Sequence, residues 1–308
     1  MELGFQAVGV CDVVPAPHMR EYQEWLSKGY AGSMDYLLTQ VKLKATPEEL
    51  LPHAKSVIAV ALNYFQNTEH VQGSPRIARY ALGRDYHKVI RGKLRTLSRW
   101  ISDTYPDARC RPCVDSAPIF ERDYAHLAGL GFFGKNTMLI DPKRGSWFFI
   151  GLLLTTESFA PDVTQEGGCG TCRKCIDACP TGAIIQEGGH WQLDSRRCIS
   201  YLTIEHEGPI DPQLQSRMGG WTFGCDVCQE VCPFNEVRER QPLRGTTTRE
   251  RDFIPVHKWP NLKELVVIED EWWNELSTGS PIRRTGIEGL RRNALINLQN
   301  EKGDSSLT

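Results

Sequence analysis

Eight of the eleven cysteines in this 308-residue chain fall between residues 169 and 232, and their spacing constrains the fold more than any other feature. The first run is Cys169-x2-Cys172-x2-Cys175-x3-Cys179-Pro180. In bacterial ferredoxins this spacing lets three thiolates hold one [4Fe–4S] cubane while the fourth thiolate reaches across to a second cubane. The run therefore predicts a ferredoxin-like module.

A second run, Cys225-x2-Cys228-x3-Cys232-Pro233, repeats the end of the first but has Thr222 where its first cysteine would stand. Cys198 is the one further cysteine in this half of the chain, and it completes a set of eight, the number that two cubanes need. Structural zinc is the main alternative, although zinc sites rarely repeat such a run. The crossover rule predicts cluster 1 with Cys169, Cys172, Cys175 and Cys232, and cluster 2 with Cys179, Cys198, Cys225 and Cys228.

The residues before the cysteines alternate between strand and helix patterns, which predict an α+β domain. We expect strands at 56–61 and 146–155, a basic amphipathic helix at 85–101, and amphipathic helices again after residue 259. Three units follow: an α+β catalytic domain at 1–160, the two-cluster ferredoxin-like module at 161–240, and a helical C-terminal region at 241–308. The longest apolar run is too short to span a bilayer and the start shows no export signal, so we expect a cytoplasmic protein.

Asp115 stands before a predicted helix that runs through Glu121 and Ala128, with Pro118 in what would be its first turn. From position alone, capping of that helix is the favoured role, and proton donation is the alternative. The remaining cysteines, Cys110, Cys113 and Cys11, lack a second pair nearby and are expected to be buried thiols.

Two groups of basic residues stand out although the net charge is only −2. Eight lysines and arginines lie between residues 76 and 99 against one acid, and a second group lies at 283–292. Such groups can bind a polyanion, but solvated helix faces are the more common explanation.

Several motifs together resemble one known family. They are residues 78–88 (ARYALGRDYHK), 114–118 (VDSAP), 128–131 (AGLG), 197–205 (RCISYLTIE), 279–284 (GSPIRR) and both cysteine runs. In these motifs the chain is similar, over nearly its whole length, to epoxyqueuosine reductases, cobalamin-dependent iron–sulfur enzymes that complete queuosine at the wobble position of tRNA. The resemblance implies a nitroreductase-like cobalamin-binding domain, the two-cluster module, and a short, partial HEAT-like helical region.

The resemblance also implies a reaction. Electrons from an external low-potential donor pass through the two clusters to cobalamin, whose reduced cobalt attacks the epoxide, while Asp115 donates a proton to the leaving oxygen. A buried carboxyl beside the corrin is expected to have a raised pKa. No histidine ligand to cobalt is expected, and the protein should act as a monomer.

The resemblance places further residues less securely. Cobalamin contacts are expected at Lys135, Asn136, Thr137, Ser146, Ser200 and Tyr201. Contacts to tRNA phosphates are expected at Arg79, Arg84, Lys88, Arg283, Arg284 and Arg291. The chain stops after what resembles the first helical pair of a repeat, so tRNA binding is expected to be weaker than in longer relatives.

Two other functions compete with this one. A reductive dehalogenase shares cobalamin and two cubanes but usually carries a twin-arginine export signal, which is not found here. An electron carrier without a substrate of its own needs only the residues around the clusters, so the large preceding domain argues against it.

Overall fold

The computed structural model describes residues 3–68, 71–255 and 258–304. Its centre is a four-stranded antiparallel sheet with the order β1-β2-β7-β4. These strands span Ala7–Asp12 (β1), Ser56–Asn63 (β2), Cys110–Cys113 (β4) and Phe148–Thr155 (β7). Both central strands, β2 and β7, are buried along almost their whole length, so the sheet must be covered on both faces.

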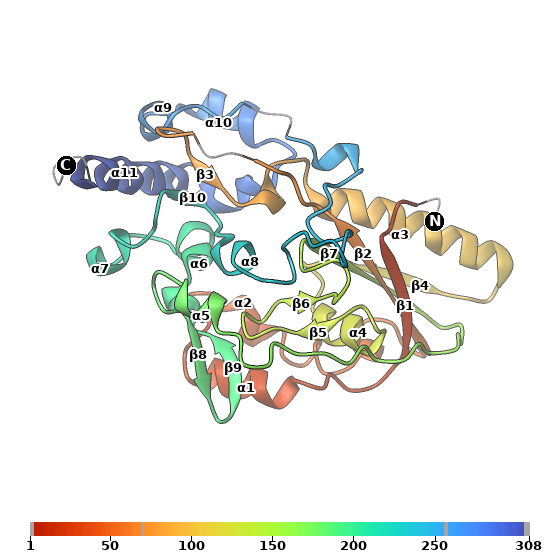
Figure 1. The fold of residues 1–308 in the computed structure, drawn as a ribbon. Coiled ribbons are helices and arrows are strands. Elements are labelled where there is room, and N and C mark those ends of the chain that lie inside the picture. Colours follow the sequence, from red (N-terminus) through yellow and green to blue (C-terminus); the bar gives the residue numbers. More distant parts are fainter. Residues whose placement is uncertain (1–2, 69–70, 256–257, 305–308) are drawn as a thin grey trace.

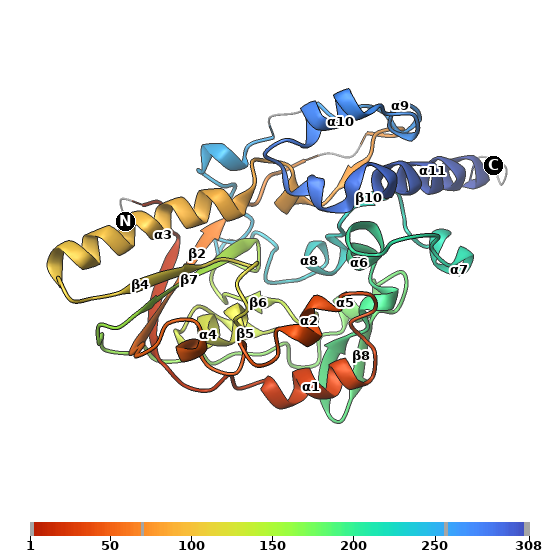
Figure 2. The ribbon, with the colours of Figure 1, turned by 180° about the vertical axis from the view of Figure 1, so that it is seen from behind.

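The alternation of side chains along β2 divides the core into two layers. Val57 and Ala59 point to one face, where they pack with α4 (Glu121–Leu127). Ile58 and Val60 point to the other face, where they pack with α3 (Tyr86–Thr104). Figures 1 and 2 show α3 and α4 on opposite sides of the sheet. Gly151 in β7 permits close contact with α3, because a Cβ there would lie 2.6 Å from Ile90 Cγ2.

The expected strands at 56–61 and 146–155 and the expected helix at 85–101 correspond to β2, β7 and α3. The predicted combination of helices and sheet is therefore confirmed. The helix after Asp115 starts later than expected, at Glu121, with Phe120 as its N-cap. Asp115 and Pro118 lie in the preceding loop, so the expectation that Asp115 caps this helix is wrong.

The cysteine-bearing region consists of short elements. They are α5 (Lys174–Asp177), β8 (Ile184–Glu187), β9 (His190–Leu193), α6 (Ile199–Ile204), α7 (Pro212–Gln215), β10 (Trp221–Phe223) and α8 (Val227–Glu230). Strand β10 pairs in parallel with β3 (Arg76–Ile77), so an early segment of the chain is joined directly to this region. Arg76 also lies over the Trp221 ring at 4.1 Å from its centroid.

The C-terminal helices are α9 (Leu262–Val266), α10 (Asp270–Ser277) and α11 (Gly286–Asp304). They share one apolar cluster, which also takes in Ile77 and Phe223 from the β3–β10 pair. Figure 1 shows them gathered at one end of the molecule. The remaining elements are α1 (Met19–Ser27), α2 (Tyr36–Thr39), the hairpin of β5 (Phe132–Phe133) and β6 (Leu139–Ile140), and 3₁₀ turns at Pro47–Glu49, Arg79–Ala81, Ser195–Arg197, Arg251–Phe253 and Pro281–Thr285.

Among the residues that the structure describes, no helix has the length and apolar character needed to cross a membrane.

Candidate functional site

The seven cysteines of the two runs, together with Cys198, are free thiols that fall into two groups. In the first group, burial and the charges of Cys169, Cys232 and Cys172 together raise the pKa of Cys175 to about 11. These four residues line a cavity of about 410 Å³. Their membership matches the set expected for cluster 1.

The second group is formed by the other four cysteines. Burial raises the pKa of Cys225, and its neighbours Cys198 and Cys179 add to the rise. Burial likewise raises the pKa of Cys228, and the charges of Cys225, Cys198 and, from the first group, Cys175 add to the rise. Cys198 thus lies with Cys225 and Cys179, and its role as the eighth cluster ligand stays a prediction. Within the described residues no three His, Cys, Asp or Glu side chains are grouped as ligands of a single metal ion.

The glycine-rich loop expected to contact cobalamin touches the cysteine runs. The Lys135 backbone N–H donates to Cys169 Sγ at 3.5 Å, and its ammonium donates to the carbonyls of Gly170 and Cys172 at 2.7 and 2.9 Å. The side-chain amide of Asn136 donates to the Cys228 carbonyl at 3.2 Å. This loop therefore contacts both cysteine groups.

Asp115 contacts two residues in the first turn of α3, Tyr86 and His87. Its backbone is left-handed, with φ of 44°, a conformation that aspartate tolerates better than most residues. The Tyr86 hydroxyl donates to Asp115 Oδ2 at 2.8 Å, and His87 Nε2 lies 2.9 Å from the same oxygen. On its other side, His87 Nδ1 lies 2.7 Å from Asp85 Oδ1. One imidazole thus bridges two carboxylates.

At this site the pKa of Asp115 is lowered and the pKa of His87 is raised. Burial pushes the pKa of Asp115 up, but hydrogen bonds from His87 and Tyr86 outweigh burial and leave the pKa below its usual value. Burial lowers the pKa of His87, but hydrogen bonds to Asp115 and Asp85 raise it to about 9. These contacts therefore favour a carboxylate at Asp115 beside an imidazolium at His87 in the protein alone, and the raised pKa expected beside a bound corrin stays a prediction.

Asp115, Glu121, Arg122 and Lys44 form a charged site at the protein surface, called the Asp115 site below. The side chain of Asp115 is 59% exposed. Glu121 accepts a hydrogen bond from the Asp115 backbone N–H. Burial and the charge of Asp115 raise the pKa of Glu121 to about 8. Arg122, the next residue in α4, donates to the carbonyl of Thr137. This hydrogen bond joins the Asp115 site to the loop that contacts the cysteines.

Sequence reasoning assigned no role to His87, Glu121, Arg122 or Lys44, whose charge also acts on this site. Lys44 lies over the ring of Phe120, at 5.4 Å from its centroid. The available signal was the Asp-Tyr-His sequence at the start of α3, which lies within a motif that the family resemblance used.

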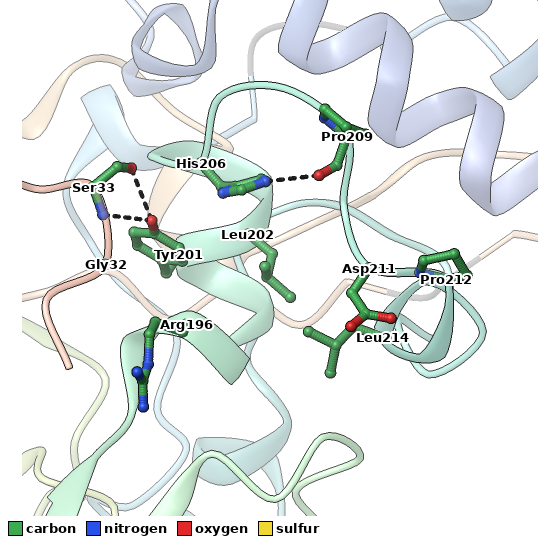
Figure 3. Close-up of a pocket in the computed structure, with 10 residues that line it drawn as sticks. All are labelled: Gly32, Ser33, Arg196, Tyr201, Leu202, His206, Pro209, Asp211, Pro212 and Leu214. Atoms are coloured by element: carbon green, nitrogen blue, oxygen red, sulfur yellow. Dashed lines mark hydrogen bonds between the residues drawn. The ribbon is translucent and has the colours of Figure 1, made fainter. Parts of the chain in front are cut away.

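The three other expected cobalamin contacts are Ser146, Tyr201 and Ser200. Ser146 is 1% exposed, and its hydroxyl donates to Gln229 at 2.9 Å and accepts from Asn235 at 3.0 Å. The Tyr201 hydroxyl accepts from the Ser33 backbone N–H at 2.8 Å. Figure 3 shows Tyr201 and Ser33 in a surface pocket of about 640 Å³, with His206 and Leu202 also on its wall. Ser200 lies half-buried beside Tyr201 in α6.

The basic residues expected at tRNA divide into exposed and engaged side chains. Lys88, Arg84 and Arg283 are exposed. Arg284 is also exposed, pairs with Glu205 at 2.8 Å and lies over Tyr36, whose pKa responds to Asp115. Tyr36 thus lies between Arg284 and the Asp115 site.

Arg79 and Arg291 are engaged within the protein. Arg79 is 14% exposed, and its guanidinium contacts Asp226 at 3.2 Å and Glu230 at 2.6 Å. Arg291 donates to the Ile268 carbonyl and pairs with Glu288. Arg79 in particular joins the 3₁₀ turn before α3 to α8 of the cysteine-bearing region.

Comparison with known proteins agrees with these two centres. Residues 168–235 match the family model "4Fe-4S double cluster binding domain", and residues 44–116 match "Epoxyqueuosine reductase QueG, DUF1730". The epoxyqueuosine reductase of Vibrio cholerae is 42% identical over 97% of this chain and 81% of its own length. The chain belongs to the epoxyqueuosine reductase family. The Escherichia coli epoxyqueuosine reductase is 40% identical over 100% of this chain and 80% of its own length.

Solved epoxyqueuosine reductases share the fold. A selenomethionine-labelled crystal structure matches with a TM-score of 0.85 and 32% identity over 99% of this chain and 80% of the other. A second, with a tRNA-Tyr epoxyqueuosine-modified stem loop, matches with a TM-score of 0.85 and 31% identity over the same shares. In a Bacillus subtilis structure (TM-score 0.84, 30% identity, 99% and 80% covered), a catalytic loop named for an aspartate is swung out of the active site.

Proposed function

We propose that this chain reduces epoxyqueuosine to queuosine at the wobble position of tRNA, as the last step of queuosine synthesis. The observation that carries the proposal is the joining of two centres: the Asp115 site, through Arg122, and the paired cysteine groups both contact the loop at 134–137. Membership of the epoxyqueuosine reductase family favours this reaction over reductive dehalogenation. A simple electron carrier would have no need of the Asp115 site.

We assign two [4Fe–4S] clusters to the two cysteine groups, with Cys169, Cys172, Cys175 and Cys232 around one and Cys179, Cys198, Cys225 and Cys228 around the other. The cavity lined by the first group supports this fit. The mutual influence of the thiols on their pKa values supports the second set. The match to a double-cluster family model agrees with both.

We place cobalamin beside Asp115, whose carboxylate is exposed and so open to a bound group. When bound, cobalamin supplies a strongly reducing cobalt centre. The residues best placed to hold it are those of the 134–137 loop, above all Thr137, which Arg122 anchors. Ser146 fits less well because its hydroxyl is already bonded to two protein side chains.

The chain's own residues would hold the substrate and move the proton. Asp115 delivers a proton to the oxygen that leaves the epoxide, since an unprotonated oxygen is a poor leaving group. The wobble nucleoside must be turned out of its loop to reach this carboxylate. Arg284, Arg283, Lys88 and Arg84 are exposed and can bind the neighbouring phosphates.

Several finer features belong to the same proposal. They are a nitroreductase-like character of residues 1–160, a ferredoxin-like module at 161–240, and a partial HEAT-like repeat at 241–308. We further propose an external low-potential electron donor, a monomeric enzyme, and a cytoplasmic location, where tRNA is found.

The test is an anaerobic assay of the reconstituted protein with cobalamin, a chemical low-potential reductant and tRNA that carries epoxyqueuosine. Mass spectrometry of the digested nucleosides should show queuosine formed only when all components are present. Absence of conversion by protein with both clusters and cobalamin bound would refute the proposal.

A further inference from the structure

The reaction proposed above needs more protons than Asp115 holds. Removing an epoxide oxygen as water, with formation of a carbon–carbon double bond, consumes two electrons and two protons. The electrons come from the low-potential one-electron donor. A single carboxylic acid carries one proton, and in this structure Asp115 carries none, because its pKa lies below the usual value. A second group must therefore supply protons to it.

We propose that His87 is the proton store that loads Asp115, and that Asp85 holds the charged imidazole in place for this transfer. The inference rests on the proposed function. His87 Nε2 lies 2.9 Å from Asp115 Oδ2, and His87 Nδ1 lies 2.7 Å from Asp85 Oδ1. The His87 backbone N–H also donates to Asp85 at 3.0 Å, so the carboxylate that caps α3 fixes the imidazole from two sides.

The transfer follows from the geometry. When the substrate nucleoside covers Asp115, the carboxylate loses the water that its 59% exposure allows, and burial favours its neutral form. The proton on His87 Nε2 then moves to Asp115 Oδ2, and from Asp115 to the substrate oxygen. His87 keeps the hydrogen on Nδ1, shared with Asp85. Because His87 is 27% exposed, solvent can protonate it again for the second proton.

Other titratable and charged groups surround Asp115 and His87. Tyr86 donates to the same Asp115 oxygen and stacks on the His87 ring at 4.1 Å between centroids. Burial and the charge of Asp115 raise the pKa of Tyr86, so it stays protonated and acts only as a donor of a hydrogen bond. Glu121, Arg122 and Lys44 act on Asp115 from α4 and from the N-terminal segment, but none bonds to its carboxylate.

The test compares the pH dependence of single-turnover conversion in the parent protein, His87→Gln and Asp85→Asn, with His190→Gln as a control. His190 is exposed in the β9 strand, far from α3 in the fold (Figure 1). The parent rate should fall as pH rises through about 9, where His87 loses its proton. His87→Gln should lose that limb and react at least ~10-fold more slowly, because water must then protonate Asp115. Asp85→Asn should move the limb to lower pH, and His190→Gln should match the parent.

A second measurement does not depend on turnover. In ¹⁵N-histidine NMR of the cluster-loaded protein, one of the eight histidines should titrate near pH 9. That signal should be missing in His87→Gln and shifted to lower pH in Asp85→Asn. If His87→Gln were damaged in its clusters, the Asp85→Asn profile would decide.

Parent-like rate and alkaline limb in His87→Gln, or an unmoved limb in folded Asp85→Asn, would overturn the proton store while leaving the proposed function intact. Failure of the parent protein to convert epoxyqueuosine would instead refute the proposed function, and the NMR titration would still report whether His87 holds the proton.

Discussion

Replacing Arg79 by methionine separates two roles for this residue, a brace inside the protein and a contact to tRNA. Methionine keeps a long unbranched side chain but removes the guanidinium. The guanidinium lies 3.2 Å from Asp226 and 2.6 Å from Glu230, and its Nε donates to the Gln66 carbonyl at 3.1 Å. Its loss would leave Asp226, only 2% exposed, as a buried carboxylate without its cation.

The expected loss of stability follows from that burial. Removing one partner of a buried ion pair typically destabilises a protein by about 3–5 kcal/mol. At roughly 2–4 °C per kcal/mol for a chain of this size, the unfolding midpoint should fall by about 6–20 °C. Arg84→Met is the matched control, because Arg84 is 57% exposed and its pair with Asp252 spans 3.4 Å. A surface pair of this kind contributes about 0–1 kcal/mol.

Thermal unfolding followed by circular dichroism, under anaerobic conditions with both clusters loaded, measures the difference between the two variants. The salt dependence of tRNA binding should be the same in Arg79→Met and the parent, since a guanidinium between two carboxylates releases no counterion from a phosphate. The reasoning is refuted if Arg79→Met is as stable as Arg84→Met and binds tRNA with a flatter salt dependence. Arg79 would then be a phosphate contact.

Four further changes test the site. Asp115→Asn keeps a side chain that tolerates the left-handed backbone, so fold and clusters should persist while turnover, measured by nucleoside mass spectrometry, falls by at least ~10²-fold; parent-like turnover would make Asp115 structural. Cys198→Ala should lose one cubane, and iron analysis that still accounted for both would remove Cys198 from the ligands. Alanine at both Arg283 and Arg284 should lower the slope of tRNA affinity against log salt by about 0.7–0.9 per lost phosphate contact, whereas an unchanged slope would make them ordinary surface residues. Lys135→Gln keeps the backbone N–H beside Cys169 but removes the ammonium near Cys172, so one cluster should shift to lower potential in an EPR-monitored titration; equal shifts in both would contradict this assignment.

Local patterns were sufficient to predict the elements whose periodicity is strong. The alternation in β2, the apolar run in β7 and the amphipathic pattern of α3 each reflect burial against the layers that the structure contains. The grouping of cysteines was also predictable, because short gaps restrict which thiols can share one cubane. For the strands and the helix this information lies within the element itself, whereas the cysteine sets also need the crossover rule, which joins Cys232 to the first run.

The roles of Arg79 and His87 could not be predicted in this way, since their partners are distant in sequence. Arg79 binds a carboxylate 147 residues away, and His87 binds one 28 residues away. A basic residue in sequence looks the same whether its cation faces a phosphate or a buried aspartate. The pKa of Asp115 shows the same limit, because burial alone predicted a rise and the two hydrogen bonds that reverse it come from α3.

The proposed supplies of protons and electrons to Asp115 lie on different elements. The proposed proton supply is the first turn of α3, where Asp85, Tyr86 and His87 meet the Asp115 loop. The proposed electron supply lies beside the 134–137 loop, which contacts both cysteine groups through Lys135 and Asn136 and accepts a hydrogen bond from Arg122 of the Asp115 site. Because the two sides share no hydrogen bond among these residues, a change in α3 should alter the pH dependence without moving the cluster potentials. Changes at Lys135 should do the reverse, so the two supplies can be measured separately in one protein.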